Sequence, residues 1–378
     1  MRGRCFLLRL AFPLRLALRP VLRGTRRGTS RDKTFYVWSN VVLGTWTRPP
    51  LSAQIALMVD TGEAKNGTGL GRIVKVTLAL AILASLIYHV NVHELVQALG
   101  QLTWGTFTLL ALWAVILIYV SALKWSYFLR ALGRRMPLLQ LFNLYLVGYF
   151  VNLVLPSFIG GDAVRSWYAG KETGQHQAMT ATILERYTGL TAMIVLALFF
   201  MWFVSFITWQ IECVVLVVAF GVVVVTVLAL SPKLISLVER LPYAQLLTKH
   251  VHKIQEGFYT ARKDRLLLVK AFVLSFAYHT FTIGNTAAAA WAVGWWNPPI
   301  QDLFVVIPLI LLLGALPITP GGLGIQEGAF YYFLHQLGAT PAQAMGVAVV
   351  LRVKSYILAL IGGVVWLRLR RVSDCRRS

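Results

Sequence analysis

Charged residues and cysteines are scarce in this sequence. Only 13% of its 378 residues are Asp, Glu, Lys or Arg, whereas a soluble domain carries about 25%. A soluble fold of this length would need more polar surface to cover its core, so a soluble enzyme is excluded. The three cysteines (Cys5, Cys213 and Cys375) lie far apart, and their spacing indicates neither a disulfide framework nor a metal site.

Hydrophobic residues take the place of the missing charges. They account for 57% of the chain, and the mean hydropathy is +0.68. Several apolar runs reach the ~20 residues that an α-helix needs to cross a bilayer. The sequence therefore predicts an all-α polytopic membrane protein.

Acidic residues are also few, which leaves a formal net charge of +22. Residues 1–57 hold 11 Lys or Arg and one acid, while residues 58–378 hold 25 and 13. In a membrane protein such an excess usually lies in cytoplasmic loops. We therefore attribute the charge to membrane orientation rather than to a nucleic-acid partner.

The basic segment 1–57 is expected to lie outside the folded domain. Pro13 and Pro20 interrupt any helix in it. We interpret it as a disordered extension or an upstream extension of the reading frame; a surface-associated basic arm and a targeting peptide are the alternatives. Met58 opens a short polar leader (58–72), which is typical of the start of a bacterial inner-membrane protein.

One transmembrane domain is predicted over residues 73–367, followed by a basic tail (368–378). The runs long enough to cross the membrane are Ile73–Val92, Trp104–Leu123, Thr180–Ser205, Ile211–Leu230, Leu266–Val293 and Gln343–Leu367. Two further apolar stretches, Leu141–Leu155 and Leu303–Leu316, are shorter. As helices they would reach only ~22 Å of the ~30 Å hydrocarbon core.

The distribution of basic residues predicts that these two short stretches enter the membrane and return on the same side. The loop 231–265 contains seven Lys or Arg against three acids, so it should be cytoplasmic. It would lie outside if Leu141–Leu155 crossed completely. The same reasoning makes Leu303–Leu316 re-entrant from the outer face. We therefore predict six full spans, two re-entrant hairpins and both termini in the cytoplasm. A further cytoplasmic loop would hold Lys124, Arg130, Arg134 and Arg135.

The two short stretches end in related sequences. LPSFIGG (155–161) matches LPITPGG (316–322) at an offset of 161 residues, and Arg186 matches Arg352 at an offset of 166, each preceded by the tripeptide QAM. Because the copies would enter from opposite faces, they form an inverted-topology repeat, which many transporters use for alternating access.

The double glycines of the repeat, Gly160–Gly161 and Gly321–Gly322, are candidates for a binding site. Non-helical backbone at membrane depth is tolerated only where protein buries it or water reaches it. Helices that restart after these glycines could direct free N–H groups at an anion such as a lipid phosphate. The alternative is that both are tight packing turns between helices.

Charged side chains also lie in or near the apolar region. Each costs at least ~2.5–3.5 kcal/mol at the centre of a bilayer, so each should face a partner or a water-filled cavity. Four cations against three anions leave one positive charge, which suits a phosphate-bearing substrate. The alternative is a closed set of salt bridges, for instance Arg352 with Glu327. The charged residues are Asp162, Arg165, Glu185, Arg186, Glu327, Arg352 and Lys354.

At these residues the chain resembles the transmembrane flippase-like region of the lysylphosphatidylglycerol synthetase/flippase family. The resemblance covers residues 70–370 and is most specific at LPSFIGGDAVRSWY with ILERYTGL, and at LPITPGGLGIQEGAFYYFL with GVAVVLR. Full-length members carry a soluble aminoacyl-transfer domain after this region. Because only a short tail follows the last predicted span here, we expect a stand-alone member that is not an enzyme.

The resemblance implies an inner-membrane protein that moves a lipid with an anionic or phosphate-bearing head group between leaflets. Carried over by motif, Arg165 and Glu327 would be the principal charged residues of the substrate site, followed by Asp162, Arg186 and Arg352, together with the four glycines. A non-transporting scaffold that recruits a glycosyltransferase or lipid synthase through loop 231–265 is the alternative. No cofactor and no metal are expected.

Overall fold

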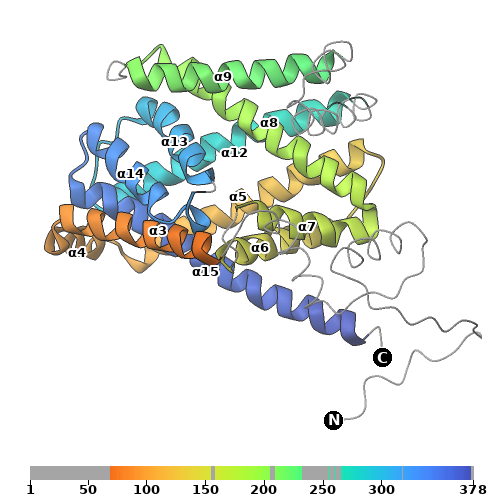
Figure 1. The fold of residues 1–378 in the computed structure, drawn as a ribbon, viewed down its shortest axis with the longest axis horizontal. Helices are drawn as coiled ribbons and strands as arrows, with labels where there is room; N and C mark the ends of the chain where they lie inside the picture. Colours follow the sequence, from red (N-terminus) through yellow and green to blue (C-terminus); the bar gives the residue numbers. More distant parts are fainter. Residues whose placement is uncertain are drawn as a thin grey trace, which may run out of the picture. The chain divides into compact units, whose positions relative to one another are not determined.

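The structure is a computed structural model. It describes residues 69–154, 158–204, 209–231, 265–316 and 318–375, together with residues 255 and 259. These residues form 11 α-helices and one 3-10 helix (Figure 1). The predicted extension 1–57, the leader up to residue 68 and nearly all of loop 231–265 lie outside the described residues.

Four helices are long and apolar enough to cross a membrane. They are α5 (Trp104–Ala131), α8 (Gln175–Met201), α12 (Arg265–Ala292) and α15 (Pro341–Cys375). Each contains an apolar stretch of 27 to 29 residues, well above the ~20 residues that a span requires. The prediction of an all-helical polytopic membrane protein is confirmed.

The other two predicted full spans correspond to helices whose apolar parts are shorter. Helix α3 (Gly69–His89) is apolar over Val74–Leu86, and α9 (Trp209–Leu230) is apolar over Glu212–Leu228. The predicted run to Val92 is interrupted, because Asn91 accepts a hydrogen bond from the His93 N–H and begins a separate helix, α4 (Val92–Gly100). A full crossing by α3 and α9 stays a prediction.

The two short apolar stretches are short helices, and each is followed by a second short helix. These are α6 (Leu138–Val154) with α7 (Phe158–Thr173), and α13 (Ile300–Ala315) with α14 (Ile325–Gln336). At 1.5 Å per residue none of the four exceeds ~26 Å, which is less than the ~30 Å hydrocarbon core.

Helices α5, α6, α7 and α8 correspond in order to α12, α13, α14 and α15. Each packing contact in one set has a counterpart in the other when the two sets are exchanged. Helix α5 packs against α12; α6 packs against α15 and α13 against α8; α7 packs against α8 and α14 against α15. Two hydrophobic clusters, one around Trp125 and Leu184 and the other around Ile307 and Leu334, each include residues of both halves, α5–α8 and α12–α15. Helices α6 and α13 therefore lie against a long helix of the opposite half as well as one of their own.

Three sequence-based boundaries were wrong. Helix α5 continues to Ala131, so Lys124 and Arg130 belong to it and not to a loop. Helix α7 already begins at Phe158, so Gly160 and Gly161 lie in its first turn. In the second copy, residues Pro320–Gly322 form a 3-10 turn and α14 starts only after Gly324. Unlike the first copy, the second turn has three glycines at positive φ, namely Gly321, Gly322 and Gly324.

Candidate functional site

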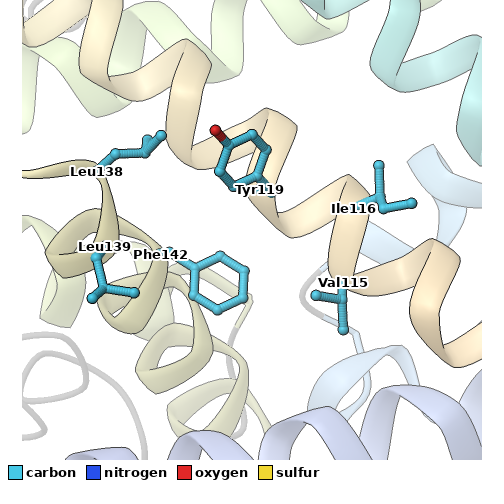
Figure 2. Close-up of a pocket in the computed structure, with 6 residues that line it drawn as sticks. All are labelled: Val115, Ile116, Tyr119, Leu138, Leu139 and Phe142. Carbon is cyan, nitrogen blue, oxygen red and sulfur yellow. The ribbon is translucent and has the colours of Figure 1, made fainter.

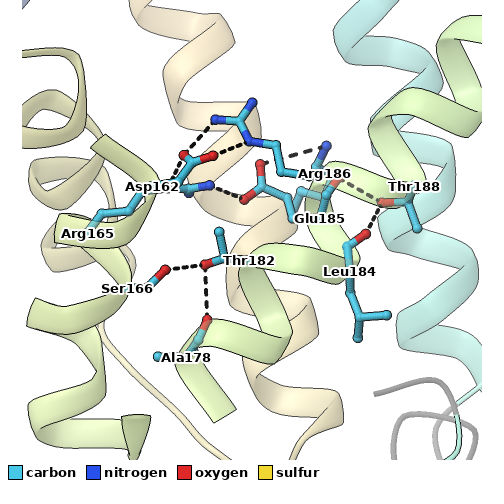
Figure 3. Close-up of polar contacts among 10 residues, drawn as sticks. Asp162, Arg165, Ser166, Ala178, Thr182, Leu184, Glu185, Arg186 and Thr188 are labelled. Atoms are coloured by element: carbon cyan, nitrogen blue, oxygen red, sulfur yellow. Dashed lines mark hydrogen bonds and ion pairs between the residues drawn. The ribbon is translucent and has the colours of Figure 1, made fainter. Parts of the chain in front are cut away.

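The first cluster of charges lies between α7 and α8. Arg165 donates from Nε to Asp162 Oδ1 and from Nη2 to Glu185 Oε2, both at 2.9 Å. Arg186 donates to both oxygens of Asp162, at 2.6 and 2.7 Å. Asp162 and Arg165 are one turn apart on α7 and therefore share a face, whereas Glu185 and Arg186 are adjacent on α8. Figure 3 shows the Asp162 carboxylate between the two arginines.

Arg165 is enclosed by aromatic rings and by a second cation. Its guanidinium carbon lies 4.7 Å from the ring centre of Trp125 and 4.2 Å from that of Tyr145, within the range of a cation–π interaction. Lys124 Nζ lies 3.9 Å from Glu185 Oε1 on the other side. The cluster thus holds three cations and two carboxylates.

Its two arginines differ greatly in exposure. The Arg165 side chain is 1% exposed, and its Nη1 is buried without a hydrogen-bond partner. The Arg186 side chain is 60% exposed although it stands eleven residues after Gln175, the first residue of α8. Asp162 is shared by both, so the excess positive charge of the cluster is accessible at Arg186.

Lys124 also belongs to this cluster, although the sequence pattern indicated a loop position for it. It was assigned to a loop because it follows the apolar run that ends at Leu123. In the structure it is buried on α5 and faces Glu185. The signal was present: Trp125 and the apolar residues after it extend the run past the lysine to Leu132.

The second cluster joins α14 to α15. Arg352 donates from Nε to Glu327 Oε1 and from Nη1 to the carbonyl oxygen of Gly321 at 3.0 Å. The other Glu327 oxygen accepts from the Gly324 N–H at 2.7 Å. The salt bridge between Arg352 and Glu327, expected as the alternative to a water-filled cavity, is present. Like Arg186 in α8, Arg352 stands eleven residues after the first residue of its helix, Pro341.

The two clusters do not share an ion pair among the described residues. They are connected by backbone instead. Asn152 of α6 accepts the Gly161 N–H at 2.8 Å through its side chain, and its carbonyl oxygen lies 3.8 Å from where a Cβ of Gly321 would stand. The two double-glycine segments therefore come together at Asn152.

Three glycine N–H groups of the two turns are already bonded within the protein. The Gly161 N–H is bonded to Asn152, the Gly322 N–H to the Thr319 carbonyl and the Gly324 N–H to Glu327. That the helices restarting after Gly161 and Gly322 direct other N–H groups at an anion stays a prediction. The charged side chains are further candidates for recognition.

Two further polar residues of the second half also meet. Lys354 Nζ donates to Asn285 Oδ1, and Asn285 Nδ2 donates to the Leu110 carbonyl oxygen at 3.4 Å. Both side chains are buried. Asn285 thus links α12, α15 and α5 through hydrogen bonds, as polar residues within membrane helices commonly do.

A chain with several membrane-spanning helices, short paired helices and ion pairs at membrane depth is a multi-pass membrane protein with a polar centre. A family model described as "Lysylphosphatidylglycerol synthase TM region" matches residues 72–363. The chain belongs to this family, as its motifs predicted. The match is to the transmembrane region, and no synthase domain was detected.

The similar curated proteins are archaeal membrane proteins. A UPF0104 membrane protein of Methanothermobacter thermautotrophicus is 23% identical over 67% of this chain and 79% of its own length. One of Methanocaldococcus jannaschii is 23% identical over 81% of this chain and 98% of its own length. No solved structure matches the chain. The predicted location in a bacterial inner membrane stays a prediction.

Proposed function

We propose that the protein moves a phosphate-bearing lipid between the two leaflets of its membrane. The observation that carries this proposal is the exposed Arg186, which belongs to a cluster with one more cation than anions and stands deep along a membrane helix. Arg186 lies six residues after Thr180, where the predicted span begins, or ~9 Å into the span at 1.5 Å per residue. A charge at such depth marks a substrate pathway more often than a lipid-facing surface.

Arg186 has the geometry to receive a phosphate oxygen. The ion pair with Asp162 uses Nε and Nη2, which leaves Nη1 outside the pair. Planar arginine binds phosphate with directed hydrogen bonds. The Asp162 carboxylate also bonds to Arg165, so it would keep one cation while Arg186 turned towards a head group.

The arrangement of the helices supports an alternating-access mechanism. In this proposal α6–α7 and α13–α14 are the two re-entrant hairpins of an inverted repeat, and six helices cross completely. The exchange of pairings between α5–α8 and α12–α15 is what a repeat related by a pseudo-twofold axis would produce. The contact of both hairpins near Asn152 would then be the place where the halves move against each other.

The test is lipid movement in liposomes that contain the purified protein. The liposomes contain one of a panel of fluorescent lipids with phosphatidylglycerol, phosphatidylethanolamine or phosphatidylcholine heads. The fraction of the fluorescence that an impermeant quencher removes reports translocation. We expect Arg186→Gln to abolish movement of the preferred lipid. Its melting temperature should change little, because Asp162 keeps its bond to Arg165.

The matched control is Arg368→Gln, which removes another exposed arginine near the end of α15. It should transport like the unchanged protein. Transport by Arg186→Gln at the unchanged rate would overturn the proposed role of this residue. Absence of movement for every lipid in the unchanged protein would overturn the transport function itself.

A further inference from the structure

The outer surface of the first half carries an apolar groove between α5 and α6. Its volume is about 510 Å³, and all its lining residues are hydrophobic or aromatic. Figure 2 shows side chains of α6 facing those of α5 across the groove. The lining residues are Val115, Ile116 and Tyr119 of α5 and Leu138, Leu139 and Phe142 of α6.

The groove belongs to a helix that lies in the membrane. Helix α5 is one of the four long apolar helices, and Ile116, Tyr119 and Leu139 are largely exposed on the groove. Hydrocarbon is therefore the surrounding solvent of this surface. A groove of apolar side chains in that position accepts an acyl chain rather than water.

Three exposed arginines stand next to the groove in the chain. Arg130 lies in the last turn of α5, and Arg134 and Arg135 lie in the loop that joins α5 to α6. This loop is held in place, because Gly133 adopts a φ of 75° and the Arg134 N–H donates to the Leu129 carbonyl oxygen at 2.8 Å. Among the described residues no carboxylate forms an ion pair with these arginines.

The spacing between the arginines and the groove fits one phospholipid molecule. Leu138 lies three positions after Arg135 in the chain, so their Cα atoms are at most ~11 Å apart. Along α5, Tyr119 lies eleven residues before Arg130, or ~17 Å. This is close to half of the ~30 Å hydrocarbon core, which is the depth that one acyl chain occupies.

We infer that the α5–α6 groove with Arg130, Arg134 and Arg135 is a binding site for an anionic phospholipid. One acyl chain lies between Ile116 and Leu139, and the arginines bind the negatively charged head group. This site is separate from the charged cluster at Arg186 and does not depend on transport. It is a docking site on the lipid-facing surface of the first half.

The experiment titrates the purified full-length protein with dioleoyl phosphatidylglycerol or dioleoyl phosphatidylcholine and counts bound lipids by native mass spectrometry. We expect tighter binding of phosphatidylglycerol. The double variant Arg134→Gln/Arg135→Gln should lose this preference, with about fivefold weaker binding for each arginine removed. Ile116→Trp, which fills the groove, should weaken the binding of both lipids.

Two control variants define the site. Leu112→Trp adds the same side chain one turn earlier on α5, where Leu112 is exposed but does not line the groove, and it should bind both lipids normally. Arg368→Gln should keep the preference for phosphatidylglycerol. Equal affinity of the unchanged protein for both lipids would overturn the inference. So would equal effects of the two tryptophan variants, or a preference that survives loss of both arginines.

Discussion

Arg165 and Arg186 have the same charge and share one carboxylate, but they differ in their surroundings and therefore in the role we expect for each. Arg165 is buried among Trp125, Tyr145 and Glu185, whereas Arg186 is exposed. The sequence could identify both as charges within an apolar region. It could not show which one is enclosed, because that depends on the packing of α5 and α6 around α7.

Replacing Arg165 by Gln should destabilise the protein. Glu185 would keep only Lys124, at 3.9 Å, and a buried charge without its close partner costs ~3–5 kcal/mol. We expect a clear fall in melting temperature in detergent and reduced expression. Arg186→Gln is the internal control, since it leaves Asp162 paired. If both variants melted at the same temperature, the Arg165–Glu185 pair would contribute no more to stability than the Arg186–Asp162 pair.

The opposite result is expected at Lys354. Its ammonium group is buried and bonds to the neutral side chain of Asn285, so its desolvation is poorly compensated. Lys354→Met keeps the length of the side chain and removes the charge. Its melting temperature should equal or exceed that of the unchanged protein, although the Asn285 Oδ1 acceptor loses its donor at a cost of ~1–3 kcal/mol. A strong fall in stability would contradict this account.

At the scale of helices, the sequence predicted the existence and type of each helix better than the residues at which it begins and ends. The short stretch Leu141–Leu155 is close to α6, and Leu303–Leu316 is close to α13, because apolar runs and the Leu-Pro that follows set these limits locally. The end of α5 was misplaced because a lysine was taken to be at the membrane surface. Its partner Glu185 is 61 residues further along the chain, and no local pattern shows that pairing.

The turns after the two short helices differ for a similar reason. Their sequences match at the double glycine, but Pro320 and Gly324 occur in the second copy alone. Proline begins the 3-10 turn, and Gly324 adopts a φ of 82° before α14 starts. The shared motif therefore predicted a break in the helix at both double glycines, but it did not predict that the two turns differ in backbone conformation.

Gly161 of α7 packs closely against α6, and alanine should not fit there. A Cβ atom would lie 2.3 Å from the Gly148 carbonyl oxygen and 2.6 Å from Asn152 Oδ1. The helices would have to separate, at a cost of roughly 1–3 kcal/mol or more, and the bond from the Gly161 N–H to Asn152 would weaken. We expect Gly161→Ala to lower the melting temperature and to reduce lipid movement.

Gly221→Ala in α9 provides the comparison, because nothing lies within 4 Å of its added Cβ. Alanine is favoured over glycine within a helix by about 1 kcal/mol, so this variant should be at least as stable as the unchanged protein. Equal behaviour of the two alanine variants would show that the α6–α7 contact is loose.

At the scale of the whole molecule, the two halves are packed into one another. Helix α6 of the first half lies on α15 of the second, and α13 lies on α8. The sequence repeat indicated two related halves, but it could not reveal these crossed contacts, because they join residues that are more than a hundred positions apart. The arrangement implies that movement of one hairpin would be transmitted to the long helix of the opposite half.

The orientation of the halves in the membrane gives the last prediction. If α6 and α7 form a re-entrant hairpin, the loop 231–265 with its seven Lys or Arg is cytoplasmic. If α6 crosses completely, this loop lies outside. Single cysteines distinguish the two topologies in a protein whose natural Cys5, Cys213 and Cys375 have been replaced by serine.

Ser236→Cys should be protected from an impermeant maleimide in intact cells and should react after lysis. Asn297→Cys, an exposed position in the segment between α12 and α13, should react in intact cells, because six spans with two re-entrant hairpins place it on the outer face. Labelling of Ser236→Cys from outside, with protection of Asn297→Cys, would mean that α6 crosses the membrane. The two halves would then not be inverted copies, and the alternating-access proposal would lose its structural basis even if Arg186 still bound a phosphate.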